Sequence, residues 1–368
     1  MKTIAVCLIV RDEEQVLARI LGAAALFADE IIVLDTGSAD RSAEIAREFT
    51  PKVFSMEWCD DFACARNTAA SYASSDYVMW LDADDVIEKE DIGRLIELKK
   101  MDFYNKDILF LLYTSVCKDS DLWSGSGCLR DRICRREYAC SWIYPIHEVI
   151  EYPAHASSID CTEIRIFHDK VHENEPGRNL RIFDKKIAEG FVMNEFNKGY
   201  YVRELAGADR PDEACQLYMT LTDPYVLYYA LPFYLWSVGR LLQSRDRQEL
   251  QTDCLKKLQK LREDIGPKEL VSAALGAALI DLGRMDEAEG YLLEAAGKDL
   301  DYTDHCVHYP AYADFVPWTM LCRLYLERGE FPRAYNCHLK AKKSRPGNPQ
   351  VFFYDLYFRE ADGQLLKK

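Results

Sequence analysis

The sequence has no long run of basic residues. Its densest basic stretch, residues 341–345, holds Lys342, Lys343 and Arg345, and we interpret it as the solvated end of a helix. The 368 residues carry a net charge of −15, with a pI near 5.0. We therefore expect the surface to repel nucleic acid and anionic lipid.

Long apolar runs are also missing. The longest one, residues 226–236, is shorter than the roughly 20 residues of a membrane span and contains Pro232. Residues 3–10 are too few for the apolar part of a secretory leader, and the charged residues 11–14 follow without a small-residue cleavage site. We expect a soluble, cytoplasmic protein without a transmembrane segment.

Paired cysteines are the third absence. The 13 cysteines include no CxxC pair, which argues against a disulfide framework and a structural zinc site. Most of them are expected to be small buried side chains in a reducing compartment. His305, Cys306 and His308 are close enough to suggest metal ligands, but without distant partners we interpret them as part of an ordinary loop.

The residues that are present suit a large folded core. Hydrophobic residues make up 49% of the chain, and the length favours two domains. Strand-like runs at residues 3–10, 30–35, 52–55 and 76–81 alternate with helical patterns at 16–24, from about 41, and at 62–73. This alternation predicts an α/β domain with a doubly wound sheet.

Carboxylates follow two of these strands. Asp35 ends the second one, and Asp82, Asp84 and Asp85 come directly after the fourth. Ligands of open α/β sheets bind beyond the carboxyl ends of the strands, and carboxylate oxygens suit Mg²⁺ or Mn²⁺. The cluster is therefore a candidate metal site that a nucleotide completes, and the alternative is that Asp84 or Asp85 caps the next helix.

Four motifs in order give the first half of the chain a family resemblance. They are VRDEE at residues 10–14, IVLDTGSAD at 32–40, DFACARN at 61–67 and WLDADD at 80–85. With them, residues 1 to about 170 resemble a family 2 glycosyltransferase with the nucleotide-diphospho-sugar transferase (GT-A) fold. Two departures are Asp85, where many relatives carry Glu, and Arg11, where Asn or Lys is common.

The resemblance implies a UDP-sugar donor, a divalent cation (Mg²⁺ or Mn²⁺) and specific roles for the matching residues. Asp35 and Arg66 would contact the base, Glu13 would lie near the nucleoside, and Asp82 and Asp84 would hold the ribose and the metal. The donor-binding residues it implies are Val10, Arg11, Glu13, Asp35, Arg66, Asp82 and Ala83. A cation would stabilise the negative charge that develops on the leaving diphosphate.

The general base is less clearly marked. An Arg-rich segment at 130–135 precedes Ile146–Ile150, and the resemblance implies that His147 and Glu148 reach the site, His147 as a metal or diphosphate ligand and Glu148 as the base. On a regular strand only one of them would face the site. A surface pair remains an alternative, and Asp119 and Asp121 are other candidate bases.

A second histidine pair lies near the end of this half. His168 and His172 would face one side of a helix and could ligate a metal, but with no third ligand nearby we favour a domain boundary. We place the domains at residues 1–172 for the transferase and 200–368 for a helical domain, with 173–199 as the linker region.

The second half shows a tetratricopeptide-like repeat. Trp318, Leu321, Tyr325, Gly329 and Ala334 fit the repeat anchors, and so do the corresponding residues from Ser272 to Ala295. A weaker copy spans about 200–221, and an insert at 299–312 lengthens one connection. The predicted fold is thus a GT-A domain followed by an all-α tetratricopeptide-like domain.

Two functions are open for the repeats. They could stabilise the transferase domain or form a homodimer, or they could hold a peptide, protein or glycan acceptor near the site. The domain order resembles glycocin-type S-glycosyltransferases, which modify Cys or Ser of peptides, and other relatives act on lipopolysaccharide cores or surface glycans. An inactive peptide-binding adaptor is the alternative of another class; a nucleotidyltransferase is disfavoured because residues 11–14 are acidic.

Overall fold

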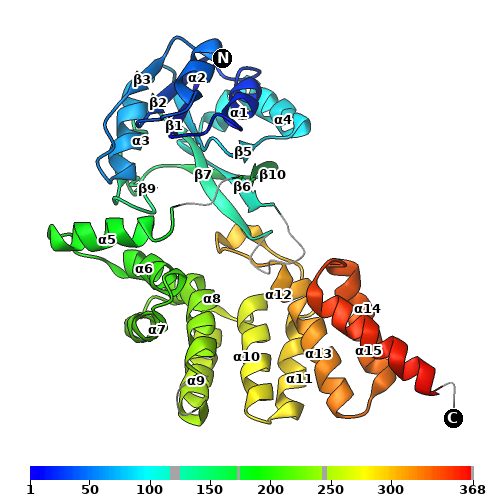
Figure 1. Cartoon of the computed structure of the whole chain (residues 1–368). Coiled ribbons are helices and arrows are strands. Elements are labelled where there is room, and N and C mark those ends of the chain that lie inside the picture. Colours follow the sequence, from blue (N-terminus) through cyan, green and yellow to red (C-terminus); the bar gives the residue numbers. More distant parts are fainter. Residues whose placement is uncertain (117–124, 172–174, 243–246, 366–368) are drawn as a thin grey trace. The chain divides into compact units, whose positions relative to one another are not determined.

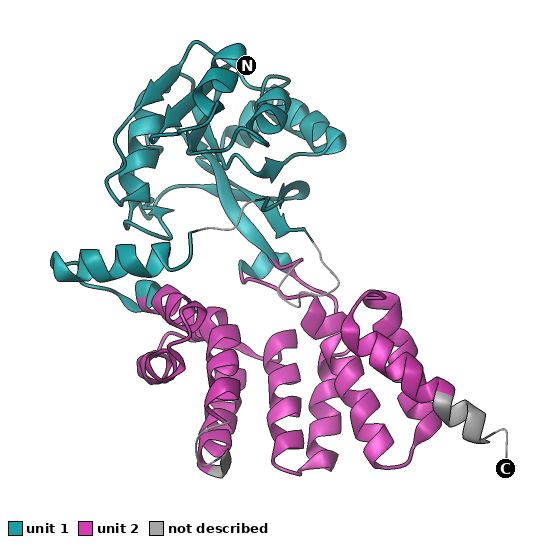
Figure 2. Cartoon of the chain, viewed as in Figure 1, with its two compact units in different colours: residues 1–116, 127–197, 302–305 teal, residues 117–126, 198–301, 306–368 magenta. Residues whose placement is uncertain are grey.

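The structure is a computed structural model, which describes residues 1–116, 125–171, 175–242 and 247–365. The chain forms two compact units (Figure 2). The first contains residues 1–116, 127–197 and 302–305, and the second is built mainly from residues 198–301 and 306–368.

The first unit is organised around an eight-stranded sheet (Figure 1). In sheet order the strands are β3 (Val53–Ser55), β2 (Glu30–Asp35), β1 (Ile4–Val10), β4 (Tyr77–Leu81), β7 (Gly127–Arg135), β6 (Ile108–Ser115), β10 (Ser158–His168) and β5 (Asp85–Val86). β3, β2, β1 and β4 are mutually parallel, as the alternating pattern predicts.

The other half of the sheet has mixed direction. β7 is antiparallel to both β4 and β6, whereas β10 is parallel to β6. The two-residue strand β5 pairs antiparallel with the end of β10, so that His168 lies opposite Asp85. A separate two-stranded sheet joins β8 (Trp142–Ile143) and β9 (Val149–Ile150).

Helices cover both faces of the sheet. The side chains of β1 therefore alternate between two apolar layers, one on each face. Ile4, Val6 and Leu8 pack in the layer formed with α1 (Leu17–Ala24), α2 (Ser42–Phe49) and α4 (Lys89–Lys100). Ala5 and Cys7 pack in the opposite layer, with α3 (Phe62–Ser71). The unit also contains the 3₁₀ helix η1 (Asp102–Asn105) and α5 (Arg178–Ala188).

The second unit consists of helical pairs (Figure 1). They are α6 (Glu195–Gly207) with α7 (Pro211–Thr220), α8 (Pro224–Leu241) with α9 (Arg247–Ile265), α10 (Glu269–Asp281) with α11 (Met285–Ala295), and α13 (Val316–Glu327) with α14 (Phe331–Ser344). α15 (Pro349–Leu365) follows, and the short helix α12 (Ala311–Asp314) precedes α13, whereas the 3₁₀ helix η2 (Tyr302–Asp304) belongs to the first unit. Three of the pairs coincide with the three predicted repeats; the repeat anchors do not identify α8 and α9.

Small residues allow the paired helices to approach closely. Gly276 of α10 faces α11, and a Cβ atom built on it would lie 2.5 Å from Leu292 Cγ. This contact explains why an anchor of the repeat must be glycine here. His338 of α14 is buried, and its Nε2 lies 2.8 Å from Asp355 Oδ1.

A buried polar group fixes part of the insert. Glu269 Oε1 accepts hydrogen bonds from Tyr228 Oη at 2.9 Å and from the Tyr309 amide at 3.3 Å, and it lies 3.1 Å from His308 Nδ1. His308 is therefore held within the helical unit by Glu269.

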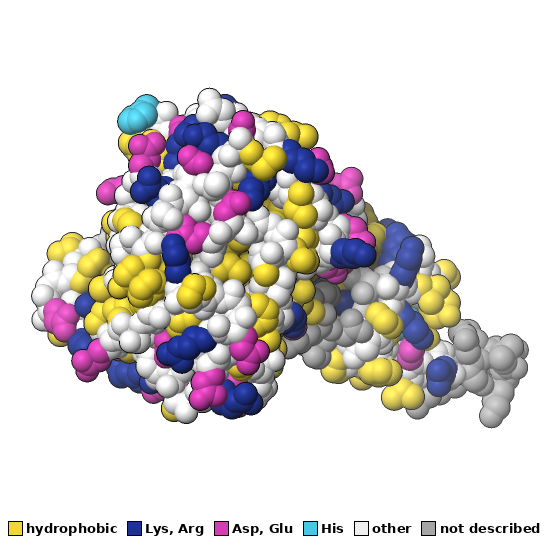
Figure 3. All heavy atoms as spheres, turned by 90° about the horizontal axis from the view of Figure 1, so that it is seen from above, with side chains coloured by type: hydrophobic (Ala, Val, Ile, Leu, Met, Phe, Trp, Pro, Cys, Tyr) yellow, Lys and Arg dark blue, Asp and Glu magenta, His cyan; other side chains and the backbone are white. Residues whose placement is uncertain are grey.

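None of the helices in the described part of the chain combines the length and the apolar character needed to cross a membrane. On the face drawn in Figure 3, acidic and basic side chains are interspersed.

Candidate active site

The acidic residues 82–85 follow β4 and form a tight turn, which we call the acidic turn. Hydrogen bonds within the turn stabilise it. The Asp82 amide donates to Asp85 Oδ2 at 2.9 Å, and the Asp85 amide donates to the Asp82 carbonyl at 3.1 Å. Asp85 then starts β5, and α4 begins only at Lys89. The alternative that Asp84 or Asp85 caps the next helix is therefore wrong.

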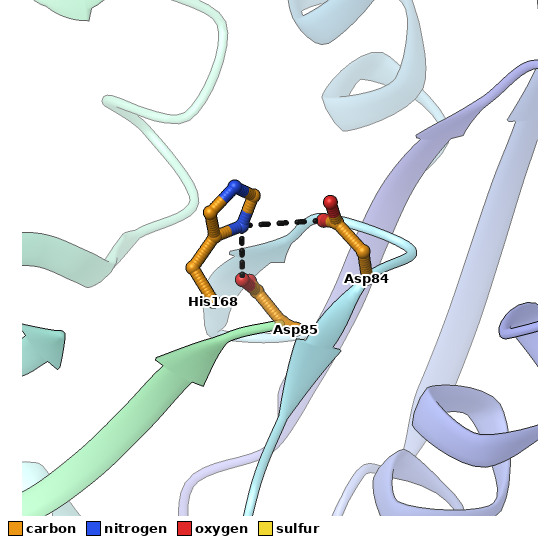
Figure 4. Close-up of side chains that lie close together, drawn as sticks. All are labelled: Asp84, Asp85 and His168. Atoms are coloured by element: carbon orange, nitrogen blue, oxygen red, sulfur yellow. Dashed lines mark ion pairs between the residues drawn. The ribbon is translucent and has the colours of Figure 1, made fainter. Parts of the chain in front are cut away.

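Asp84, Asp85 and His168 form a candidate metal site (Figure 4). His168 Nδ1 lies 3.4 Å from Asp84 Oδ1 and 3.8 Å from Asp85 Oδ1, and ligand atoms of the three residues lie within 4.8 Å of one another. The pairing of β5 with β10 produces this arrangement, because it places His168 opposite Asp85. Within the described residues this is the one group of three or more such potential ligands.

The donor set suits a divalent cation. Asp85 Oδ1 and His168 Nδ1 are buried and have no hydrogen-bond partner among the described residues, so a cation bound between them would satisfy both atoms. Carboxylate oxygens with one imidazole fit Mn²⁺ or Mg²⁺, although they do not choose between them. These residues fit the cation that the family resemblance implies.

The charge state of His168 depends on its carboxylate neighbours. Burial alone would lower its pKa, but Asp84 and Asp85 outweigh burial and raise the pKa of His168 to about 10. Without a metal the imidazole is thus protonated at neutral pH. A bound cation would have to replace this proton, because only neutral imidazole is a ligand.

Arg66 of α3 joins two of the predicted site residues. Its Nη2 lies 2.9 Å from Asp82 Oδ1, and its Nε lies 2.5 Å from Glu148 Oε1. The guanidinium also lies over the rings of Trp80 and Trp142, at 4.7 and 5.1 Å from the ring centroids. The structure therefore brings Arg66, Asp82 and Glu148 into one network.

This network controls the charge on Asp82. Burial would raise the pKa of Asp82, but the guanidinium groups of Arg66 and Arg132 outweigh it and hold the pKa below its usual range. Asp82 is consequently ionised throughout the physiological range.

The loops after β1 and β2 are linked by side-chain to backbone hydrogen bonds. The Asp12 amide donates to Ser38 Oγ, the Glu13 amide donates to Ser42 Oγ at 2.7 Å, and the Ala39 amide donates to Asp12 Oδ1 at 2.7 Å. Asp35 Oδ1 accepts the Ser38 amide at 2.9 Å. Val10 contributes its carbonyl, which accepts the Thr36 amide.

Glu13 is the unusual carboxyl of these loops. Burial, together with the nearby Asp84 and Asp40, raises the pKa of Glu13 to about 7. Its Oε2 is buried and has no hydrogen-bond partner in the described part of the chain. Arg11, by contrast, is exposed, and Ala83 is buried within the acidic turn.

His147 lies outside the group formed by Asp84, Asp85 and His168. Its φ is 53°, and its ring centroid is 6.1 Å from that of Phe183 in α5. Residues 146–148 are not a regular strand, because β9 begins at Val149. The rule that alternate residues face opposite sides therefore does not apply to His147 and Glu148.

Two further residues belong to the site but are not among the sequence predictions for it. The sequence places His168 near a domain boundary, and the helix considered there is wrong, because His168 ends β10. Arg132 of β7 is fully buried beside Asp85. His172 and the alternative bases Asp119 and Asp121 lie outside the described residues.

Comparisons with known proteins agree with this geometry. Residues 5–152 match the family described as Glycosyl transferase family 2. These residues form a family 2 glycosyltransferase domain. The domain includes the acidic turn, Arg66, Arg132 and Glu148, whereas His168 lies beyond the matched range.

Two relatives are similar to this chain over parts of its length. Over 266 residues the chain is 25% identical to the SPbeta prophage-derived glycosyltransferase SunS of Bacillus subtilis, covering 69% of this chain and 53% of SunS. It is 46% identical over 85 residues to a TPR repeat-containing protein of Synechococcus elongatus, covering 23% of this chain and 21% of that protein. The chain thus spans about half of SunS and about a fifth of the Synechococcus protein.

A solved structure of S. aureus TarS 1–349 in complex with UDP-GlcNAc is also similar to this chain. It has a TM-score of 0.37 and 14% sequence identity, and the match covers 80% of this chain and 90% of that one.

Proposed function

We propose that this protein is a metal-dependent, inverting glycosyltransferase that moves a hexose from a UDP-sugar to an acceptor. The observation that carries the proposal is the group of Asp84, Asp85 and His168 at the end of β4, beside the Arg66 network in a family 2 glycosyltransferase domain. A divalent cation bound there would neutralise the charge that develops on the leaving UDP.

Other residues of the site are proposed to bind the rest of the donor and the cation. Asp35, Glu13 and Arg11, in the loops after β2 and β1, are proposed to bind the nucleoside with Val10 and Ala83. Asp82 would accept hydrogen bonds from the ribose while Arg66 holds its carboxylate in place. His168 is proposed as a metal ligand in addition to Asp84, and His147 remains a candidate for contacting the diphosphate.

Glu148 is the proposed general base. An ionised carboxylate only accepts hydrogen bonds, and Arg66 fixes the position of one Glu148 oxygen at 2.5 Å from its Nε. In a single displacement with inversion, the acceptor attacks the anomeric carbon, UDP leaves from the opposite face, and the acceptor proton passes to the base. Replacement of Glu148 by Gln should then abolish transfer while donor binding persists.

The acceptor is proposed to be a peptide or protein side chain, Cys or Ser, held by the helical repeats. Support comes from the stacked helical pairs of the second unit, an architecture that provides extended binding surfaces, and from the resemblance in domain order. A surface glycan or lipopolysaccharide core remains the alternative, and so does an inactive adaptor. Incubation with each acceptor class and a UDP-sugar, followed by mass measurement, distinguishes these options.

The repeats also offer a face for a homodimer. α14 exposes Phe331, Tyr335 and Leu339, and α15 exposes Phe352, Phe353, Leu356 and Tyr357. Such side chains would together bury on the order of 600 Å² per copy, near the roughly 800 Å² per partner of a standard interface. Asp355 of α15 pairs with Lys342 and His338 of α14, so its charge is compensated within one copy.

Thermal unfolding tests the donor site directly. UDP with Mn²⁺ should raise the melting temperature of the wild-type protein, and Asp84→Ala should remove the metal-dependent part of the shift. If no nucleoside diphosphate stabilises the protein with or without Mn²⁺, the adaptor function is favoured instead. If UDP does stabilise the protein, a panel of UDP-sugars, assayed by the release of free UDP, would identify the sugar.

A further inference from the structure

Arg132 is a fully buried arginine in the sheet beneath the acidic turn. Its relative exposure is 0%, and its guanidinium carbon lies 3.7 Å from the ring centroid of Trp80 and 4.0 Å from that of Tyr113. A buried charge is costly unless it is paired, and the two rings confine the guanidinium plane between them. The side chain is therefore held in one orientation.

The hydrogen bonds of Arg132 point in one direction only. Its Nη1 donates to Asp85 Oδ2 at 3.1 Å and to the Trp80 carbonyl at 3.3 Å, and it lies 3.9 Å from Asp82 Oδ2. Its Nε and Nη2 have no hydrogen-bond partner among the described residues. All the polar contacts of this arginine are thus made to the segment that carries the acidic turn.

The two carboxylate oxygens of Asp85 consequently have different surroundings. Oδ2 accepts from both Arg132 Nη1 and the Asp82 amide, whereas Oδ1 is buried without a hydrogen-bond partner in the described part of the chain and lies 3.8 Å from His168 Nδ1. The two donors on Oδ2 favour this orientation of the carboxylate. Oδ1 is therefore directed to the candidate metal site.

We propose that Arg132 is a positioning residue for the metal site, which acts by holding Asp85 Oδ2 so that Asp85 Oδ1 faces the cation position beside His168. This inference rests on the proposed function, because it assumes that the site takes a divalent cation. In this proposal Arg132 acts through Asp85 and not by contact with the cation or the sugar. Groups that orient metal ligands in this way typically change metal affinity by about 10- to 100-fold.

The competing explanation is that Arg132 only compensates the buried charge of Asp85 during folding. The same strand provides a control for it. Arg135 Nε lies 2.6 Å from Asp107 Oδ1, and its guanidinium lies over the ring of Tyr77. This ion pair resembles that of Arg132 but does not involve the acidic turn, so breaking it should reduce stability without affecting metal binding.

The experiment measures Mn²⁺ binding by the electron paramagnetic resonance signal of free Mn²⁺, with and without UDP, together with the melting temperature. The full chain is used as wild type and as the variants R132M, R132K, R135M and D84A. R132M should bind Mn²⁺ about 10- to 100-fold more weakly. R132K should lie between R132M and wild type, because an ammonium group keeps the charge but lacks the planar guanidinium that stacks on the rings of Trp80 and Tyr113.

The outcomes separate the inference from the proposed function. If R132M and R132K bind Mn²⁺ within about twofold of wild type, or if R135M weakens binding as much as they do, the positioning role is wrong. If R132M does not fold, the Mn²⁺ affinity of R132K alone tests the positioning role, with the same twofold limit. If wild type binds no Mn²⁺ with or without UDP, or if D84A binds as well as wild type, the proposed metal site itself is wrong.

Discussion

Arg66 and Glu148 are separated by 82 positions in the sequence, yet Arg66 Nε lies 2.5 Å from Glu148 Oε1 while Nη2 of the same arginine binds Asp82. Arg66 is thus the link between the proposed base and the proposed donor-binding carboxylate. Its two contacts require the fork geometry of a guanidinium, which lysine does not have.

Replacement of Arg66 by Lys is therefore expected to reduce turnover by about 100-fold, because misplacing a reacting group by about 1 Å can cost this much. UDP release from a UDP-sugar in the presence of acceptor measures the effect. The matched control is R94K in α4, where Arg94 pairs with Asp91 at 2.7 Å outside the site. Equal turnover in R66K and R94K would contradict the role of the Arg66 network.

Replacement of His168 by Gln should raise the Mn²⁺ concentration required for half-maximal UDP release by at least about tenfold, since the imidazole is lost from the ligand set. His305 provides the control, because its Nε2 pairs with Asp160 at 3.2 Å and it is not in the metal group. H305Q should leave the Mn²⁺ requirement unchanged. An unchanged requirement in H168Q would exclude His168 as a ligand.

Glu30 makes stability depend on pH. It accepts the amides of Ser74 and Ser75 at 2.9 and 3.1 Å and pairs with Lys52. Burial opposes ionisation of Glu30, but Lys52 and the serines outweigh it and lower its pKa to about 2. The contribution of Glu30 to the free energy of unfolding is therefore complete above its unfolded pKa of about 4.3. This contribution is lost as the pH falls towards 2.

Replacement of Glu30 by Gln should accordingly lower the free energy of unfolding at pH 7 by about 1–3 kcal/mol, and the difference from wild type should shrink between pH 4.5 and 2. Urea unfolding over this pH range provides the measurement. E44Q, on the exposed side of α2, should behave like wild type. A difference between E30Q and wild type that does not change with pH would show that the charge of Glu30 is not its cause.

The close approach of α10 and α11 predicts opposite effects at two glycines. Gly276→Ala should destabilise the helical unit by about 1–3 kcal/mol, because the new Cβ would lie 2.5 Å from Leu292 Cγ. Gly290→Ala in α11 meets nothing within 4 Å and should stabilise by up to about 1 kcal/mol through helix propensity. The melting temperatures of the two variants test this prediction. Equal effects would contradict the close packing of α10 against α11 at Gly276.

The proposed dimer face gives a prediction for solution size. Wild type should sediment as a dimer at micromolar concentrations, and the double variant F353D/L356D should sediment as a monomer with its helical content intact, because charged side chains would replace apolar ones in the proposed contact. L293D is the control, since Leu293 is an exposed apolar residue of α11. A monomeric wild type at 100-fold higher concentration would rule out this face as an interface.

The sequence was sufficient for the features that depend on local pattern. Apolar runs of the length of β1, β2 and β4 identify strands, and parallel strands bring Asp35 and Asp82 to the same edge of the sheet. Helical anchors identify the three repeats. The acidic turn could therefore be located before its surroundings were known.

Features that depend on long-range register were not predictable in this way. The pairing of β5 with β10 brings His168 to Asp85, and nothing near His168 in the sequence indicates it. Arg132 looks like one more residue of an Arg-rich strand until its contacts with Asp85 and two aromatic rings are seen. In both cases the carboxylate partner, Asp85, lies more than forty positions away in the sequence, beyond the reach of periodicity.

The most direct test of the central claim is anomalous diffraction at the manganese edge from crystals grown with UDP and Mn²⁺. The account predicts a single strong peak about 2.0–2.3 Å from a carboxylate oxygen of Asp84 and from Nδ1 of His168. A manganese peak elsewhere, or UDP bound with these two side chains directed away from it, would contradict the assignment of this site.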